Sequence, residues 1–147
     1  MNNRVKISKD FYLDEFFDSK TYKNYESKNE LWKLLLKLDP NLIKGLQLLR
    51  DKLGVSLIIN NWWHGKGREW SGYRPKNTPY YSENSMHSIC RAIDIVCDIP
   101  AEKVRDFIRD NWAIFKPYFK RTEIGTSWVH IDSGFVLDDS KLTYVNP

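Results

Sequence analysis

Helical and strand-like patterns occupy different parts of this sequence, and that separation constrains the fold more than any other feature. Residues 29–38 carry apolar side chains at helical spacing, and Asp39 followed by Pro40 predicts the start of a second helix that ends at Gly54. Later segments differ: we expect strands at 55–59, 91–97 and 142–145, a helix from Pro100 to Trp112, and a hairpin of 121–124 with 128–131. The sequence therefore predicts an α+β fold, with N-terminal helices packed on a small, largely antiparallel sheet.

A long irregular stretch, residues 60–85, interrupts the strand-rich part. It contains three glycines, two prolines and six Trp or Tyr residues. A loop of this length in a compact domain is either functional or disordered, and the aromatic side chains favour an ordered loop that is pinned to the body. Because the chain has 147 residues, with 6 Trp, 8 Tyr and 7 Phe to fill a core, we expect a single domain, 1–147.

Composition excludes several classes of protein. The longest strictly apolar run, Trp112 to Phe115, is four residues long, whereas a membrane-spanning helix needs about 20, so we expect no membrane span. The basic N-terminus lacks an apolar stretch, which predicts synthesis in the cytoplasm without a Sec signal peptide. Two cysteines make no disulfide framework. The net charge of +4 is small and scattered, so we expect no nucleic-acid partner. We also expect a monomer.

Three residues form a candidate metal site: His87, Asp94 and His130. Two imidazoles and a carboxylate suit Zn²⁺, because three protein ligands leave a fourth position for a water whose pKa falls to about 7. Seven residues would place His87 and Asp94 on one face of a helix but on opposite faces of a strand. The metal interpretation therefore needs His87 in the loop, Asp94 in the strand and a bend between them. On spacing alone, two unrelated polar residues are the better interpretation.

Four ordered motifs resolve this ambiguity by resemblance. They are Asn60-Asn61-Trp62 with Ser71-Gly72-Tyr73-Arg74, Ser85-Met86-His87, Arg91-Ala92-Ile93-Asp94, and Gly125 to Asp132 with its Trp128-Val129-His130 core. Together they resemble the M15 metallopeptidases, the zinc D-alanyl-D-alanine carboxypeptidases and their relatives that cleave cell-wall peptides, and most of all the short phage-type members. The resemblance covers about residues 57–132. It implies a Hedgehog/D-Ala-D-Ala carboxypeptidase-like fold, zinc on His87, Asp94 and His130, and Arg74 as a substrate or transition-state contact.

Two positions depart from the family pattern. The glycine three residues after the first histidine is Cys90 here, and the acid that many members carry three residues before the last histidine is Ser127. Glu123 is the best replacement for the catalytic base, because hairpin pairing can bring it opposite the residues near His130. Asp132 is the competitor; it points to the same side of the strand as His130 and could orient that ligand.

The leading functional expectation is a zinc-dependent peptidase that hydrolyses D-amino-acid-containing bonds of peptidoglycan stem peptides, as a carboxypeptidase or an endopeptidase. Glu123 and Arg74 would be its catalytic residues. The alternative is a catalytically impaired module of the same fold, with activity lost at Ser127 and Cys90, that recognises cell wall or a protein partner. Without a signal peptide, action at the cell wall would require lysis, a virion or another export route.

Overall fold

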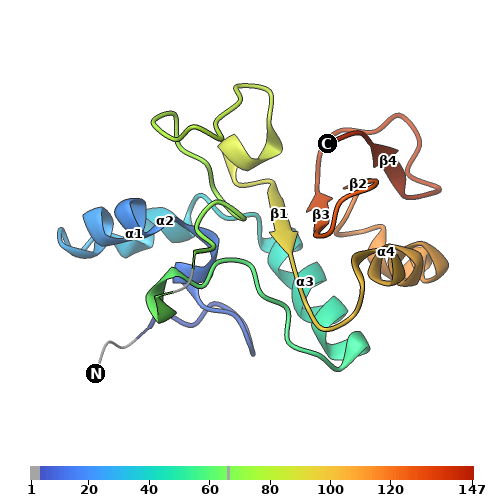
Figure 1. Cartoon of the computed structure of the whole chain (residues 1–147), viewed down its shortest axis with the longest axis horizontal. Helices are drawn as coiled ribbons and strands as arrows, with labels where there is room; N and C mark the ends of the chain where they lie inside the picture. Colours follow the sequence, from blue (N-terminus) through green and yellow to red (C-terminus); the bar gives the residue numbers. More distant parts are fainter. Residues whose placement is uncertain (1–3, 66) are drawn as a thin grey trace.

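The computed structural model describes residues 4–65 and 67–147 (Figure 1). These residues form five α-helices, three short 3-10 helices and four strands. The helices are η1 (Leu13–Phe16), α1 (Ser19–Glu26), α2 (Leu31–Leu35), α3 (Pro40–Leu53), η2 (Trp62–His64), η3 (Met86–Ile89), α4 (Ala101–Asp110) and α5 (Trp112–Phe115). The strands are β1 (Ala92–Ile95), β2 (Arg121–Glu123), β3 (Val129–Asp132) and β4 (Thr143–Val145).

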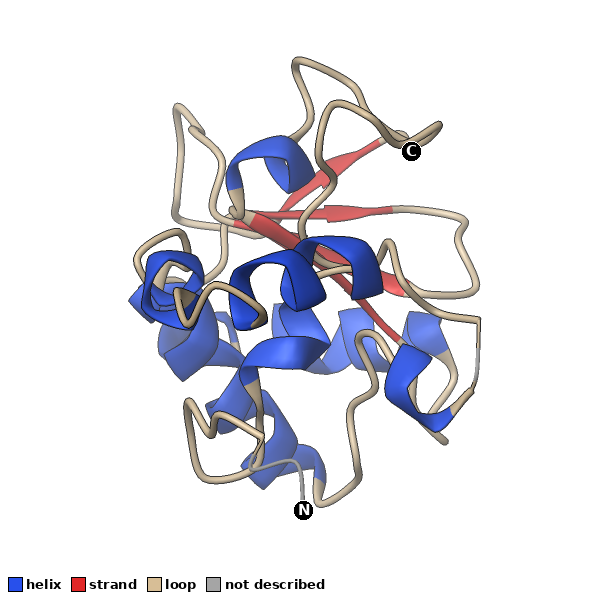
Figure 2. Ribbon diagram, turned by 90° about the vertical axis from the view of Figure 1, so that its left-hand side faces the viewer, coloured by secondary structure: helices blue, strands red, loops and turns tan. Residues whose placement is uncertain are grey.

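The four strands form one mixed sheet in the order β1-β3-β2-β4. Strand β3 pairs antiparallel with both β1 and β2, whereas β2 and β4 run parallel. The expected α+β architecture and the hairpin of β2 with β3 are therefore confirmed, with one parallel pair at the sheet edge. Figures 1 and 2 show the α-helices gathered below and beside the sheet, with α3 beneath β1 and β3.

Helix α3 begins and ends where the sequence predicts. Asp39 Oδ1 accepts a hydrogen bond from the Asn41 amide at 2.9 Å, and Pro40 is the first helical residue. Gly54 ends the helix with φ at 68°, in the left-handed region that glycine adopts without strain. Within the helix, a Cβ on Gly45 would lie 2.5 Å from Tyr118 Cβ, so glycine permits the close packing of α3 against the segment after α5.

Three predicted elements differ from the structure. The segment 55–59 is not a strand: Ile58 and Val96 exchange two backbone hydrogen bonds, but the Asn60 amide then donates to the Glu15 carbonyl, so the ladder does not continue. Helix α2 is shorter than 29–38. The helix predicted from Pro100 to Trp112 divides into α4 and α5 at Asn111, whose backbone leaves the helical region and whose side-chain amide donates to the Phe107 carbonyl.

The irregular segment 60–85 contains one 3-10 helix, η2, and no strand among its described residues. A buried side chain, Asn60, and a half-buried one, Trp62, fasten it to the N-terminal part of the chain. The Asn60 side chain donates to the Phe17 carbonyl and accepts from the Ser71 amide. The Trp62 indole N–H is shared between the carbonyls of Asp14 and Phe17. These contacts fix the loop against the body immediately before the segment that carries Arg74.

Candidate metal centre

The sheet brings two of the three proposed ligands together. Asp94 on β1 and His130 on β3 are directly paired across the antiparallel ladder, so both side chains emerge on one face. His87 lies in η3, which ends at Cys90 with φ at 57°, and the chain turns there into β1. The loop, the bend and the strand that the metal interpretation requires are all present. One ligand atom from each of the three residues lies within 4.8 Å of the others, and all three residues are buried.

His87 presents a defined nitrogen to the cluster. Its Nδ1 lies 2.7 Å from the Gly72 carbonyl oxygen, which can only accept a hydrogen bond, so Nδ1 carries the proton. The other nitrogen, Nε2, lies 3.3 Å from Asp94 Oδ1. Only glycine fits at position 72, because a Cβ there would lie 2.3 Å from the Phe16 carbonyl oxygen. Gly72 therefore supplies a backbone acceptor that orients the ring, a role that sequence reasoning did not assign to the motif.

His130 lies between two carboxylates. Its Nδ1 is 2.8 Å from Asp94 Oδ1, and its Nε2 is 3.0 Å from Asp132 Oδ2. Burial lowers the pKa of His130, but the hydrogen bonds with Asp132 and Asp94 outweigh it and raise that pKa to about 9. Burial likewise raises the pKa of Asp94, and the hydrogen bonds from His130 and His87 outweigh it, so its pKa lies below the usual range. Asp94 is therefore a carboxylate at neutral pH.

The donor set suits a divalent metal ion. His87 Nε2 and His130 Nδ1 lie 3.3 and 2.8 Å from Asp94 Oδ1, and each histidine uses its other nitrogen for a hydrogen bond. Hydrogen bonds from the non-ligating nitrogens are the usual way in which proteins orient metal-binding histidines. The buried His87–Asp94–His130 group could thus hold a metal ion, and two imidazoles with one carboxylate are a ligand set that proteins use for both zinc and iron.

Proton competition gives this site a testable pH dependence. Because the pKa of metal-free His130 is raised to about 9, its Nδ1 carries a proton at pH 7 that a metal must displace. We therefore expect the zinc Kd to fall about tenfold for each unit of rising pH between pH 6 and 8, and to level off near pH 9. Titration against a chelator of known pH dependence measures this slope. A Kd that is constant over this range would contradict the assignment of His130 Nδ1 as a ligand.

Glu123 lies beside the cluster, on the side of His130 Nδ1. Its Oε1 is 3.7 Å from that nitrogen, and its side chain is 19% exposed. Strand pairing explains the position, because Arg121 opposes Asp132 and the Thr122 hydroxyl donates to the His130 carbonyl at 2.6 Å. The hairpin thus brings Glu123 near His130, as the sequence predicts. Ser127, by contrast, is exposed in the connection between β2 and β3.

Arg74 contacts a proposed ligand directly. Its Nη2 donates to Asp94 Oδ2 at 2.7 Å, and its Nε donates to the Trp70 carbonyl at 2.7 Å. The Arg74 amide also donates to the His87 carbonyl. The guanidinium therefore helps to fix Asp94, and its side chain is still 22% exposed. The sequence predicted a contact to substrate; the bond to Asp94 was not foreseen.

Cys90 occupies the left-handed conformation that glycine adopts most easily. Its side chain is buried at 5% exposure, and burial raises the pKa of its thiol to about 12. Cys90 is not part of the His87–Asp94–His130 cluster. Cys90 therefore serves as a small buried residue at the bend, and the backbone turn that glycine would form is preserved.

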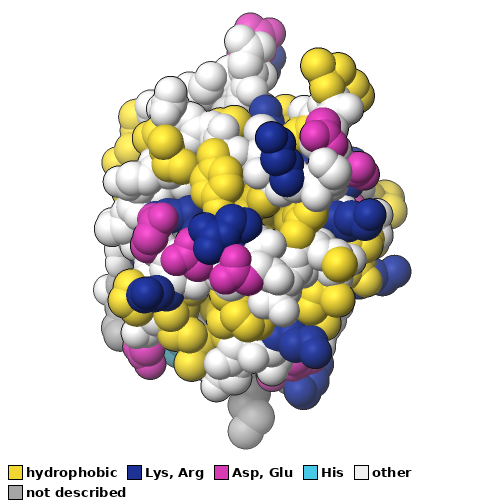
Figure 3. Space-filling view, turned by 90° about the vertical axis from the view of Figure 1, so that its right-hand side faces the viewer, with side chains coloured by type: hydrophobic (Ala, Val, Ile, Leu, Met, Phe, Trp, Pro, Cys, Tyr) yellow, Lys and Arg dark blue, Asp and Glu magenta, His cyan; other side chains and the backbone are white. Residues whose placement is uncertain are grey.

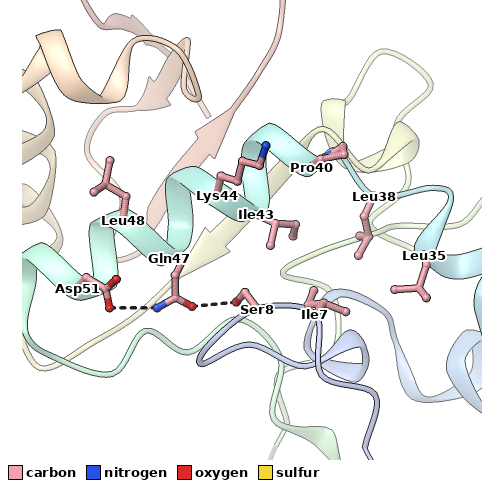
Figure 4. A pocket seen from close by; sticks show the side chains of 10 residues that line it. All are labelled: Ile7, Ser8, Leu35, Leu38, Pro40, Ile43, Lys44, Gln47, Leu48 and Asp51. Carbon is pink, nitrogen blue, oxygen red and sulfur yellow. Dashed lines mark hydrogen bonds between the residues drawn. The ribbon is translucent and has the colours of Figure 1, made fainter.

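Other surfaces lie apart from this cluster. A cavity of about 510 Å³ between α3 and residues 7–8 has mostly aliphatic walls and contains none of the cluster residues (Figure 4). The face in Figure 3 mixes basic with acidic side chains. No helix among the described residues is long and apolar enough to cross a membrane. His64 is exposed in η2.

Comparisons with known proteins add no family assignment. No protein-family model matches the chain, and neither a curated protein nor a solved structure matches it.

Proposed function

We propose that this protein is a zinc-dependent peptidase. One observation carries the proposal: a carboxylate that belongs to no ligand, that of Glu123, lies 3.7 Å from His130 Nδ1, the nitrogen that faces the His87–Asp94–His130 cluster. A hydrolytic metal site needs a base within reach of the water that it activates. A purely structural zinc site needs none and is usually closed by a fourth protein ligand.

Each residue of the site has a separate role in the proposed reaction. His87, Asp94 and His130 would hold zinc, which when bound polarises a carbonyl and lowers the pKa of a water. Glu123 takes a proton from the attacking water and passes it to the leaving amine. Arg74 donates one N–H group to Asp94 and one to the Trp70 carbonyl, and its other N–H groups can stabilise negative charge on the carbonyl oxygen. Asp132 holds the far nitrogen of His130.

The substrate class rests on the resemblance of the four motifs to the M15 metallopeptidases. We propose that the substrates are D-amino-acid-containing bonds in peptidoglycan stem peptides and that the protein acts at the cell wall. The Hedgehog/D-Ala-D-Ala carboxypeptidase-like fold is part of the same proposal. It is supported by helices packed on a small sheet whose paired strands β1 and β3 carry Asp94 and His130.

The decisive experiment digests purified peptidoglycan with the zinc-loaded protein and identifies the products by mass spectrometry. Release of D-alanine would indicate a carboxypeptidase, and cleavage within the stem or cross-link an endopeptidase. A chelator should abolish the reaction, and added zinc should restore it. Stoichiometric zinc without hydrolysis would favour the alternative, a binding module of the same fold. A protein that neither binds zinc nor cleaves the peptides would refute both.

Substitution of Arg74 by lysine tests its double role. An ammonium group cannot donate to both Asp94 and the Trp70 carbonyl with the guanidinium's geometry. We expect kcat/KM to fall by about 100-fold and the zinc Kd to rise by about tenfold. Arg109→Lys on the exposed face of α4 is the matched control and should leave both values unchanged. Wild-type kinetics in Arg74→Lys would show that Arg74 has no role in turnover.

A further inference from the structure

We propose that Arg121 is a positioning residue for the zinc ligand His130 and that it acts through Asp132. This inference rests on the metal site of the proposed function, but not on the substrate or the reaction. The described contacts form a continuous chain from the ligand to the guanidinium. His130 Nε2 meets Asp132 Oδ2 at 3.0 Å, and Asp132 Oδ1 accepts from Arg121 Nε at 2.8 Å.

The two oxygens of Asp132 have separate partners. Oδ2 faces His130, whereas Oδ1 accepts both from Arg121 and from the Gly134 amide, the latter at 2.9 Å. Asp132 is 1% exposed, so water does not replace a lost partner easily. With Oδ1 held by two donors, the carboxylate cannot rotate about its last bond without breaking them. Arg121 and the Gly134 amide together therefore determine which oxygen meets the histidine ring and from which direction.

Strand pairing places Arg121 for this contact. Arg121 on β2 is the residue directly opposite Asp132 on β3, so the two side chains share one face of the hairpin. The Arg121 side chain is 27% exposed, which lets its other N–H groups reach water while Nε stays with the carboxylate. The pair therefore needs no further buried acceptor.

Gly134 provides the space that the guanidinium occupies. A Cβ at this position would lie 2.6 Å from both Arg121 Cζ and Arg121 Nη2. The backbone of Gly134 is not in the left-handed region. Glycine is therefore needed here because it leaves room for the guanidinium, not because of its backbone conformation. Any side chain at position 134 should displace the Arg121 guanidinium, although the protein still contains this arginine and its charge. This gives a second way to break the same contact.

For metal binding, the consequence is that the orientation of the His130 ring is fixed. When His130 Nε2–H donates to Asp132, Nδ1 is the nitrogen left to bind zinc, and the ring plane is set by the carboxylate. Loss of such an outer partner weakens metal binding in proteins by about 10- to 100-fold. We expect the loss of zinc affinity in Arg121→Ala to lie at the lower end of this range, because the Gly134 amide still donates to Asp132 Oδ1.

The test measures zinc affinity by chelator competition, without any substrate. We expect Arg121→Ala and Gly134→Ala each to raise the zinc Kd by about tenfold, and Arg121→Lys to recover most of the affinity because it can still donate to Oδ1. Arg109→Ala removes an arginine from an exposed ion pair with Asp106 and should leave the Kd unchanged. Long-range ¹H–¹⁵N spectra of the zinc-bound protein should show His130 protonated at Nε2 in the wild type and a perturbed ring signal in Arg121→Ala.

The outcomes separate this inference from the proposed function. If Arg121→Ala lowers only the melting temperature of the metal-free protein and leaves the zinc Kd and the His130 signals unchanged, Arg121 is merely structural and the inference is wrong. If the affinities change as expected while no peptide is cleaved, the inference stands and the peptidase proposal fails. Absence of zinc binding by the wild type overturns both.

Discussion

Glu123→Gln should lower the rate of peptide hydrolysis by at least about 100-fold while the zinc content stays at the wild-type level. Glutamine preserves the size and polarity of the side chain but cannot accept a proton from water. The Glu123 Oε1 atom lies 3.7 Å from His130 Nδ1 and is not among the three proposed metal ligands, so its replacement removes a base and not a metal-binding atom. Single-turnover rates and metal analysis of the same preparation measure the two effects separately.

The matched comparison for Glu123 is Asp132, the second acid beside His130 that is not a proposed metal ligand. Asp132→Asn should raise the zinc Kd by about 10- to 100-fold, because Asp132 contacts His130 Nε2 on the side away from the cluster. At saturating zinc, this variant should keep much of its turnover. The reverse pattern, with zinc lost in Glu123→Gln and turnover lost in Asp132→Asn, would mean that the two roles are exchanged.

The order of local elements was predictable because it depends on neighbours in the sequence. Asp39, Pro40 and Gly54 mark helix α3 through capping and backbone preferences that act within a few residues. The hairpin of β2 with β3 follows from two short strands joined by a glycine-containing turn, and it places Glu123 near His130. Periodicity did not identify the three proposed ligands; the ordered motifs did.

Contacts between distant segments could not be predicted in this way. Residues 55–59 have the β-branched composition of a strand, but the chain leaves the sheet after a single bridge from Ile58 to Val96. The bonds of Arg74 to Asp94 and of Arg121 to Asp132 depend on which side chains the fold brings together. Neither guanidinium could be assigned a carboxylate partner from spacing, because 19 acidic side chains are available in the sequence.

His87→Ala and His130→Ala should each abolish stoichiometric zinc binding, and with it all hydrolysis. Each histidine supplies one of only three converging ligand atoms, and each is buried and held by a hydrogen bond through its other nitrogen. Loss of one leaves two protein ligands, too few for the three that hold a catalytic zinc ion. Zinc should also raise the melting temperature of the wild type, since a ligand that binds only the folded state stabilises it, and neither variant should show this rise.

His64→Ala is the control for these two substitutions, because it removes the remaining histidine of the chain from an exposed position in η2. It should retain both the zinc content and the zinc-dependent rise in melting temperature. A loss of folded structure could mimic a loss of zinc, so the metal-free variants should be compared with metal-free wild type by circular dichroism. Folded His87→Ala and His130→Ala proteins that still hold one zinc ion each would place the metal elsewhere and remove the basis of the proposed mechanism.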